Sequence, residues 1–212
     1  MKAVIFDMDG VLTDSEPFYH EAHNQVLAEA GVALSDEENQ QILGTTVEYS
    51  WRWIIDRFRL PGTLENWLAK YDRAVVAVLR AKVEPRPGLD WLLDLLAQRR
   101  LSLGLASSSE AAWVQAILQK LRLEGRFAAV ISGGMVARGK PAPDIYLRAA
   151  SELAVEPTLC LVLEDTPVGI QAARAAGMRV VAVETPSTAG LDLSGANHVV
   201  SSLEEFDPSW LD

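Results

Sequence analysis

Two aspartates stand one residue apart at the end of the first apolar run of the chain. Residues 1–10 read MKAVIFDMDG, so Asp7 and Asp9 close this run and Gly10 follows them. Because strand side chains alternate between faces, the two carboxylates can share one side of the chain. One aspartate can then attack a phosphate ester, and the other can act as acid or base. Close carboxylates repel each other unless a cation neutralises them, and the expected cation is Mg²⁺. The same pattern also suits a polar turn that leaves a strand.

Two later segments carry groups that can bind a phosphate. Residues 101–106 read LSLGLA, and Ser107 follows them just before a helical stretch. A hydroxyl and backbone amides at a helix start can hold a phosphate, although a serine there is more often an N-cap, as we expect for Ser109. Lys140 precedes a helix start marked by prolines, and its ammonium group can bind a phosphoryl oxygen. The alternative for Lys140 is an ordinary solvated lysine.

An acidic pair, Glu164 and Asp165, follows the apolar run LCLVL at 159–163. These carboxylates can bind a metal, or they can interact favourably with the dipole of the next helix. All the candidate groups lie where a strand ends or a helix begins. In open parallel α/β sheets, ligands bind beyond the carboxyl ends of the strands. The pattern therefore predicts one common site.

The second half of the chain alternates between strand and helix patterns. Such alternation predicts an α/β fold with a doubly wound, parallel, Rossmann-like sheet. Expected helices cover 89–98, 111–121, 143–153 and 168–176, and expected strands cover 101–106, 128–132, 159–163, 179–184 and 198–200.

A long helical insertion separates the first strand from this alternation. We expect a Rossmann-like core formed by 1–14 and 84–212 and an all-helical cap domain formed by 15–83. Prolines restrict the chain near 12–17 and 84–88, so these segments are the expected hinges. Helical patterns with turn signals between them cover 21–30, 36–43, 47–58 and 64–81.

The motifs resemble those of the haloacid dehalogenase superfamily. The resemblance rests on DMDGV at 7–11, on Ser107, on Lys140 and on the pair Glu164-Asp165, and it spans nearly the whole chain. The stretches DGVLTDSEP, GKPAPDIY and LEDTPVGI resemble the β-phosphoglucomutase-like branch of sugar-phosphate phosphatases, which carry a helical cap.

This resemblance implies a role for each motif. Asp7 is the implied nucleophile, which forms an aspartyl-phosphate, and Asp9 protonates the leaving group and then activates water. Ser107 and Lys140 hold the transferring phosphoryl group. Asp7, the backbone carbonyl of Asp9 and Asp165 bind Mg²⁺, with Glu164 beside them. The implied activity is a Mg²⁺-dependent phosphatase acting on a small phosphomonoester, such as a sugar phosphate or a similar metabolite.

Two alternatives stay open. In β-phosphoglucomutases an arginine grips the second phosphate at the position of Val47, and an asparagine stands at the position of Ala111. The loss of that guanidinium favours hydrolysis, although Arg52 could replace it and restore a mutase. A non-catalytic phosphate-binding module is disfavoured because it would not need an acid such as Asp9 at the leaving group. A dehalogenase would be expected to lack the carboxylates of the magnesium site.

Candidate substrate contacts flank these motifs. In the core they are Gly10 and Ser108. In the insertion they are Glu16, His20, Thr45 and Thr46, with Tyr19 and His23 also considered. The alternative for both histidines is a solvated helix position. Trp51, Trp53 and Trp67 are expected to pack within the insertion rather than to form a binding site.

Composition is compatible with this class of enzyme. The chain has 212 residues, of which 49% are hydrophobic and 23% charged, as in ordinary globular proteins. A net charge of −10 disfavours nucleic acid and anionic membranes as partners. No apolar leader precedes the first expected strand, no run reaches the length of a membrane helix, and the single Cys160 allows no internal disulfide. We therefore expect a cytoplasmic monomer with a buried, inert Cys160, whose partner is a small phosphorylated metabolite.

Overall fold

A computed structural model describes residues 1–212, and the chain divides into two compact units. The core consists of Met1–Asp14 and Val83–Asp212, and the helical unit consists of Ser15–Lys82. The expected boundary put Val83 in the insertion, whereas this buried residue begins the second segment of the core. That the two units are separate domains, with the helical one acting as a cap, stays a prediction.

The core is built on a six-stranded parallel sheet with the strand order β3-β2-β1-β4-β5-β6. The α/β fold predicted from the sequence is confirmed. Its central strand, β1, is fully buried, as expected for a parallel sheet with helices on both faces. The strands are β1 (Ala3–Phe6), β2 (Ser102–Ala106), β3 (Ala129–Ile131), β4 (Cys160–Glu164), β5 (Arg179–Val183) and β6 (His198–Val200).

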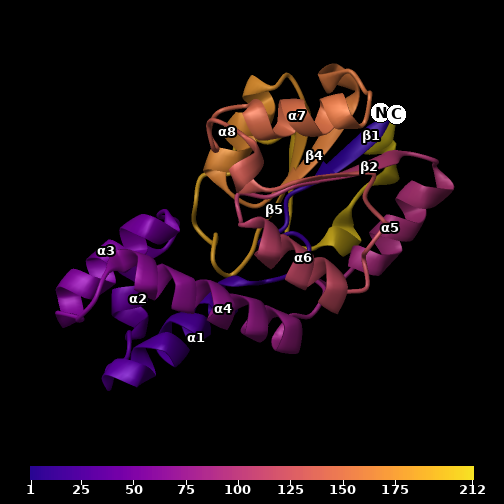
Figure 1. The fold of residues 1–212 in the computed structure, drawn as a ribbon. Helices are drawn as coiled ribbons and strands as arrows, with labels where there is room; N and C mark the ends of the chain where they lie inside the picture. Colours follow the sequence, from indigo (N-terminus) through magenta and orange to yellow (C-terminus); the bar gives the residue numbers. More distant parts are fainter. The chain divides into compact units, whose positions relative to one another are not determined.

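Four helices flank this sheet, with α7 and α8 on one face and α5 and α6 on the other (Figure 1). Alternate strand residues such as Ala3, Ile5 and Val162 pack in one cluster with Ile145 of α7 and Ala172 of α8. The period of two along each strand thus divides the apolar side chains between the two faces. The helices are α5 (Leu89–Gln98), α6 (Ala111–Lys120), α7 (Asp144–Glu152) and α8 (Pro167–Ala175).

The two chain segments that connect the core to the helical unit are joined to each other. The backbone N–H of Arg86 donates a hydrogen bond of 2.8 Å to the carbonyl of Leu12.

Cys160 is buried in β4, where burial raises the pKa of its thiol to about 11. The inert role expected for this cysteine fits that environment. None of the helices combines the length and apolar composition needed to cross a membrane.

The helical unit contains four α-helices, and α1 and α4 pack against each other. The first helix begins earlier than expected because Pro17 fits the first turn of a helix, and it ends in a short 3₁₀ turn. The other expected helices and strands agree with the observed bounds to within one residue. The helices are α1 (Glu16–Leu27), α2 (Asp36–Ile42), α3 (Val47–Phe58) and α4 (Leu64–Lys82).

A cluster of aromatic rings forms the centre of the helical unit. His23 stacks on Tyr71 with ring centroids 4.2 Å apart, and Trp51 stacks on Trp67 at 5.8 Å. The packing role expected for these two tryptophans is confirmed. The solvated position considered for His23 is wrong, because this side chain is only 6% exposed. Helix periodicity could not show this, since it does not reveal which helix covers which face.

The burial of His23 predicts that stability depends on pH. Burial of the imidazole, assisted by the charge of nearby His20, lowers its pKa from 6.5 to about 3, and the backbone of Tyr19 acts only weakly in the opposite direction. The unfolded chain binds a proton here below pH 6.5 and the folded chain does not, so the contribution of His23 to stability falls as pH falls through this window. The expected loss from His23 alone is about 2 kcal/mol on reaching about pH 5.

Urea unfolding followed by tryptophan fluorescence at neutral pH and at about pH 5 tests this expectation. We expect His23→Phe, which preserves an aromatic ring, to lose less stability on acidification than the unmodified protein. His198→Phe is the matched control, because His198 stacks on Trp210 at the exposed edge strand of the core. Equal acid sensitivity of the unmodified protein and His23→Phe would contradict the assignment.

Candidate active site

The carboxyl ends of three neighbouring strands bring the predicted groups together. In the sheet, Phe6 at the end of β1 pairs with Leu105 of β2 and Leu163 of β4. Asp7 follows β1 directly, Ser107 follows β2 and Asp165 follows β4, and all three are buried. The sheet topology therefore places at one edge residues that lie far apart in the sequence.

Lys140 joins the first and fourth motifs. Its Nζ donates to Asp7 Oδ1 at 2.8 Å and to Glu164 Oε1 at 2.5 Å. The lysine side chain is 7% exposed, so the solvated alternative for this residue is wrong. A buried ammonium needs such partners, because an unpaired charge in the interior is very costly.

Glu164 is saturated by hydrogen bonds from the protein. Its Oε1 accepts from Lys140 and from the Tyr146 hydroxyl, at 2.9 Å for the hydroxyl. Its Oε2 accepts from the backbone N–H groups of Asp165 and Thr166 and from the Thr166 hydroxyl. Gly169 permits this arrangement, because a Cβ there would overlap the carboxylate. Glu164 thus binds both Lys140 and backbone N–H groups at the start of α8. The alternative of an interaction with the next helix therefore describes part of its environment.

Tyr146 is a site residue that the sequence reasoning missed. The side chain is fully buried on α7, and its ring lies 5.2 Å from Lys140 Nζ. Burial raises its pKa well above the ordinary value, so the phenol keeps its proton and donates to Glu164. A signal existed in the sequence: a tyrosine on the apolar stripe of a helix needs a polar partner for its hydroxyl.

The charges of the site influence one another strongly. Burial would lower the pKa of Lys140, but the carboxylates of Asp7 and Glu164 outweigh it and hold this pKa well above its usual value. Burial raises the pKa of Asp7 to about 7 against the attraction of Lys140. Burial, followed by the charges of Asp7 and Glu164, raises the pKa of Asp165 to about 9. The carboxyl groups of the site therefore outnumber its positive charges.

The environment of Asp165 fits a bound cation. Its Oδ1 is buried without a hydrogen-bond partner. Gly10 has φ +78° and lies against this carboxylate so closely that a Cβ would overlap it. Oxygen atoms of Asp7, Glu164 and Asp165 lie within 4.8 Å of one another. Carboxylate oxygens are the ligands that Mg²⁺ prefers, so the donor set suits this ion.

The loop after β2 places two serines beside Asp9. Ser107 Oγ donates to Asp9 Oδ2 at 3.4 Å, and Ser109 Oγ donates to the same oxygen at 2.8 Å. The N-cap expected at Ser109 is wrong: the N-cap residue of α6 is Glu110, and no side chain caps this helix. Ser108 is exposed between the other two serines.

The candidate contacts in the helical unit have partners of their own. Glu16 begins α1, and His20 Nε2 lies 2.9 Å from the carbonyl of Leu34. Thr45 Oγ1 donates to the carbonyl of Ile42 at 2.7 Å, and Thr46 is the N-cap of α3. These contacts explain the positions of the side chains within the unit. A contact of Glu16, His20, Thr45 or Thr46 with substrate stays a prediction.

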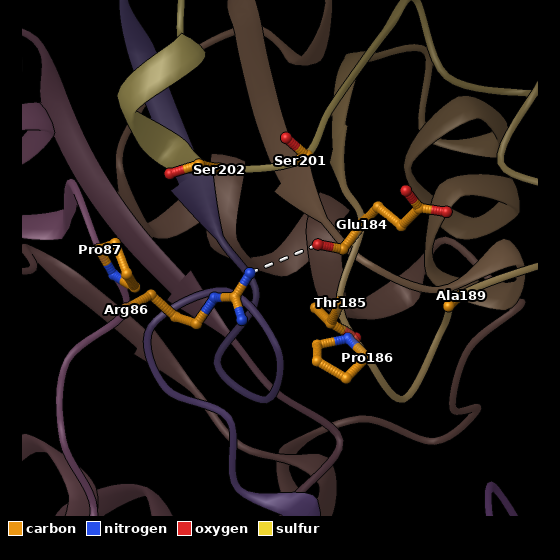
Figure 2. Close-up of a pocket in the computed structure, with 8 residues that line it drawn as sticks. All are labelled: Arg86, Pro87, Glu184, Thr185, Pro186, Ala189, Ser201 and Ser202. Atoms are coloured by element: carbon orange, nitrogen blue, oxygen red, sulfur yellow. Dashed lines mark hydrogen bonds between the residues drawn. The ribbon is translucent and has the colours of Figure 1, made fainter.

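A pocket of about 450 Å³ lies beyond the carboxyl ends of β5 and β6, and Figure 2 draws the residues that line it. Its lining includes Arg86, Glu184 and Ser202, and an Arg86 guanidinium N–H points to the carbonyl of Glu184 at 3.4 Å. None of the residues predicted for phosphate chemistry lines this pocket. The candidate site is therefore defined by the side chains around Asp7 rather than by this hollow.

Comparison with known proteins places these motifs in one family. Residues 4–183 match the model of the family described as "Haloacid dehalogenase-like hydrolase". The "Probable pseudouridine-5'-phosphatase" of Drosophila melanogaster is 36% identical over 210 residues, which cover 96% of this chain and 90% of the relative. The "Beta-phosphoglucomutase" of Bacillus subtilis (strain 168) is 33% identical over 213 residues, which cover 97% of this chain and 92% of the relative.

A solved structure resembles the chain over almost its whole length. It is the crystal structure of CbbY from Rhodobacter sphaeroides in complex with phosphate, with a TM-score of 0.86 and 28% identity. The similarity covers 97% of this chain and 96% of that one.

Proposed function

The chain belongs to the haloacid dehalogenase-like hydrolase family, and on that premise we propose that it hydrolyses a small phosphomonoester with Mg²⁺ through an aspartyl-phosphate on Asp7. It is a hydrolase that acts on phosphoric monoesters. The substrate that we propose is a sugar phosphate or a similar metabolite. The observation that carries the proposal is the convergence of Asp7, Lys140 and the unpartnered Oδ1 of Asp165 beyond the carboxyl ends of the strands.

The proposed reaction has two steps. In the first, an Asp7 oxygen attacks phosphorus, the ester P–O bond breaks, and Asp9 gives its proton to the leaving oxygen. In the second, Asp9 takes a proton from water, the water oxygen attacks phosphorus, and the bond to Asp7 breaks to release phosphate. Lys140 and Ser107 hold the phosphoryl oxygens during both steps.

Mg²⁺ bound by Asp7, the Asp9 carbonyl and Asp165 would neutralise charge on the phosphoryl group. The sequence analysis placed Glu164 beside the metal. Because both Glu164 oxygens accept hydrogen bonds from the protein, we propose that this residue instead holds Lys140 in place. The cytoplasmic location and the monomeric state stay predictions.

Metal binding should be visible as a gain in stability. We expect Mg²⁺ to raise the Tm of the unmodified protein, by the equivalent of about 2.7 kcal/mol when its concentration is a hundred times Kd. Asp165→Asn should lose this gain, because it removes a ligand. Without Mg²⁺ this variant should be at least as stable as the unmodified protein, since asparagine removes the cost of burying an ionisable carboxyl group.

Thermal unfolding with and without Mg²⁺ makes the comparison, and Asp192→Asn is the control because Asp192 lies exposed outside the site. The same rise in Tm for Asp165→Asn and the unmodified protein would remove Asp165 from the metal site.

Hydrolysis is favoured over phosphoryl transfer between sugar hydroxyls. A mutase must hold a second phosphate, and Val47 supplies no guanidinium for it. The possible substitute, Arg52, donates from both Nε and Nη2 to Glu48 Oε1, at 3.1 and 2.7 Å. The similarity to a β-phosphoglucomutase keeps mutase activity as the second candidate.

A panel of small phosphomonoesters, assayed with Mg²⁺ for free phosphate, distinguishes the two candidates. We expect phosphate release from sugar phosphates and little conversion of β-glucose 1-phosphate to glucose 6-phosphate, even when glucose 1,6-bisphosphate primes the enzyme. Val47→Arg should raise the affinity for the bisphosphate. If isomerisation is faster than phosphate release, the mutase is the correct assignment.

A further inference from the structure

We propose that Ser109 is a positioning residue for the acid and base Asp9, an inference that rests on the proposed function. The hydroxyl of Ser109 donates to Asp9 Oδ2 at 2.8 Å, which is much shorter than the 3.4 Å contact from Ser107. The N-cap residue of α6 is Glu110, so Ser109 lies before the helix and its hydroxyl donates to Asp9. The contact joins the loop after β2 to the loop after β1.

The backbone of Ser109 is fixed on both sides. Its N–H donates to Ser107 Oγ at 3.0 Å, and its carbonyl accepts from the Gly133 N–H at 3.0 Å. Gly133 also packs against the carbonyl of Ser108, the residue before Ser109, so closely that there is no room for a Cβ on Gly133. The Ser109 hydroxyl therefore projects from a segment that is tied to β2 and to the loop after β3.

Substrate binding makes Ser109 more important than Ser107 for Asp9. A serine hydroxyl carries one proton and can donate to one acceptor at a time. In the proposed reaction Ser107 donates to the phosphoryl group, so it must release Asp9 Oδ2. Ser109 still donates to this oxygen at that stage, and it keeps the carboxylate oriented during protonation of the leaving group.

Orientation of this carboxylate should affect the rate more than the binding of substrate. Asp9 is partly exposed, unlike buried Asp7, so surrounding side chains enclose it less completely. Misplacement of a catalytic group by about 1 Å can reduce a rate by about 100-fold. We expect Ser109→Ala to lower kcat by about 10- to 100-fold on substrates with poor leaving groups, with little change in KM.

The test compares a sugar phosphate with p-nitrophenyl phosphate in Ser109→Ala, in Asp9→Asn and in the double variant. The p-nitrophenolate leaving group needs little protonation. The fall in kcat caused by Ser109→Ala should therefore be several-fold smaller on p-nitrophenyl phosphate than on the sugar phosphate. Once Asp9 is replaced, replacing Ser109 should have no further effect, which a double-mutant cycle measures directly. Ser151→Ala, on the exposed surface of α7, is the control.

Three outcomes would overturn the inference: equal losses on the two substrates, multiplicative losses in the double variant, or a higher KM at unchanged kcat. The last would make Ser109 a substrate-binding residue. Failure of the proposed function looks different, because the unmodified protein would then release no phosphate or Asp7→Asn would remain active. Measuring Tm for each variant confirms that the rates compare folded proteins.

Discussion

Replacing Asp7 with asparagine is expected to abolish phosphate release, with a loss on the order of 10⁴-fold or more in kcat, because the variant lacks the nucleophile. The fold should survive this change. Asparagine has nearly the same shape, and its carbonyl can still accept from Lys140, which keeps Glu164 as its charged partner. Burial already disfavours the charged form of Asp7, as its raised pKa indicates.

Phosphate release and thermal unfolding, measured on the same preparation, test both parts of this expectation. Asp94→Asn serves as the control, since Asp94 lies on α5 and pairs with Arg126 at the surface. An active Asp7→Asn variant would falsify the nucleophile assignment, whereas an inactive but unfolded variant would contradict the expected tolerance of the site.

Replacing Lys140 with alanine is expected to reduce both stability and activity. The change leaves Asp7 and Glu164 buried without their shared cation, and breaking a buried ion pair in this way costs about 3–5 kcal/mol. Activity should fall as well, because the ammonium group that holds the phosphoryl group is lost. Urea unfolding and phosphate release measure the two effects.

A nearby ion pair provides the matched control. Arg138 pairs with Asp144 at 2.8 Å, but the arginine side chain is 71% exposed. Exposed pairs contribute little, so Arg138→Ala should leave stability and activity almost unchanged. If Lys140→Ala unfolded at the same urea concentration as Arg138→Ala, the buried ion pairs of Lys140 would not contribute to stability as expected.

Sequence reasoning identified the fold and the main groups of the site because these depend on local patterns. Apolar runs that end in polar residues indicate the carboxyl ends of strands, and parallel topology brings those ends to one edge. Asp7, Ser107 and Asp165 follow from this rule. Helix ends followed equally well from proline, glycine and apolar periodicity, as the agreement over α3 and α5 shows.

The roles of other residues could not be predicted from the sequence, because they depend on contacts between distant segments. Ser109 and Asp9 are separated by 100 positions, and only the packed loops show that the hydroxyl points to the carboxylate. Tyr146 and His23 occupy helix faces whose partners are set by tertiary packing. Periodicity showed that these faces exist, but it could not show what covers them.

The central claim is that a phosphoryl group is carried by Asp7, and chemical trapping tests it most directly. The enzyme is mixed with a hydrolysable phosphomonoester and Mg²⁺, quenched rapidly in acid, and treated with borohydride, which reduces an acyl phosphate to an alcohol. Mass spectrometry of the N-terminal peptide should then find homoserine at position 7, and only when both substrate and Mg²⁺ were present. An unmodified Asp7 during active turnover, or a modification at Asp9 or Asp165, would contradict the account.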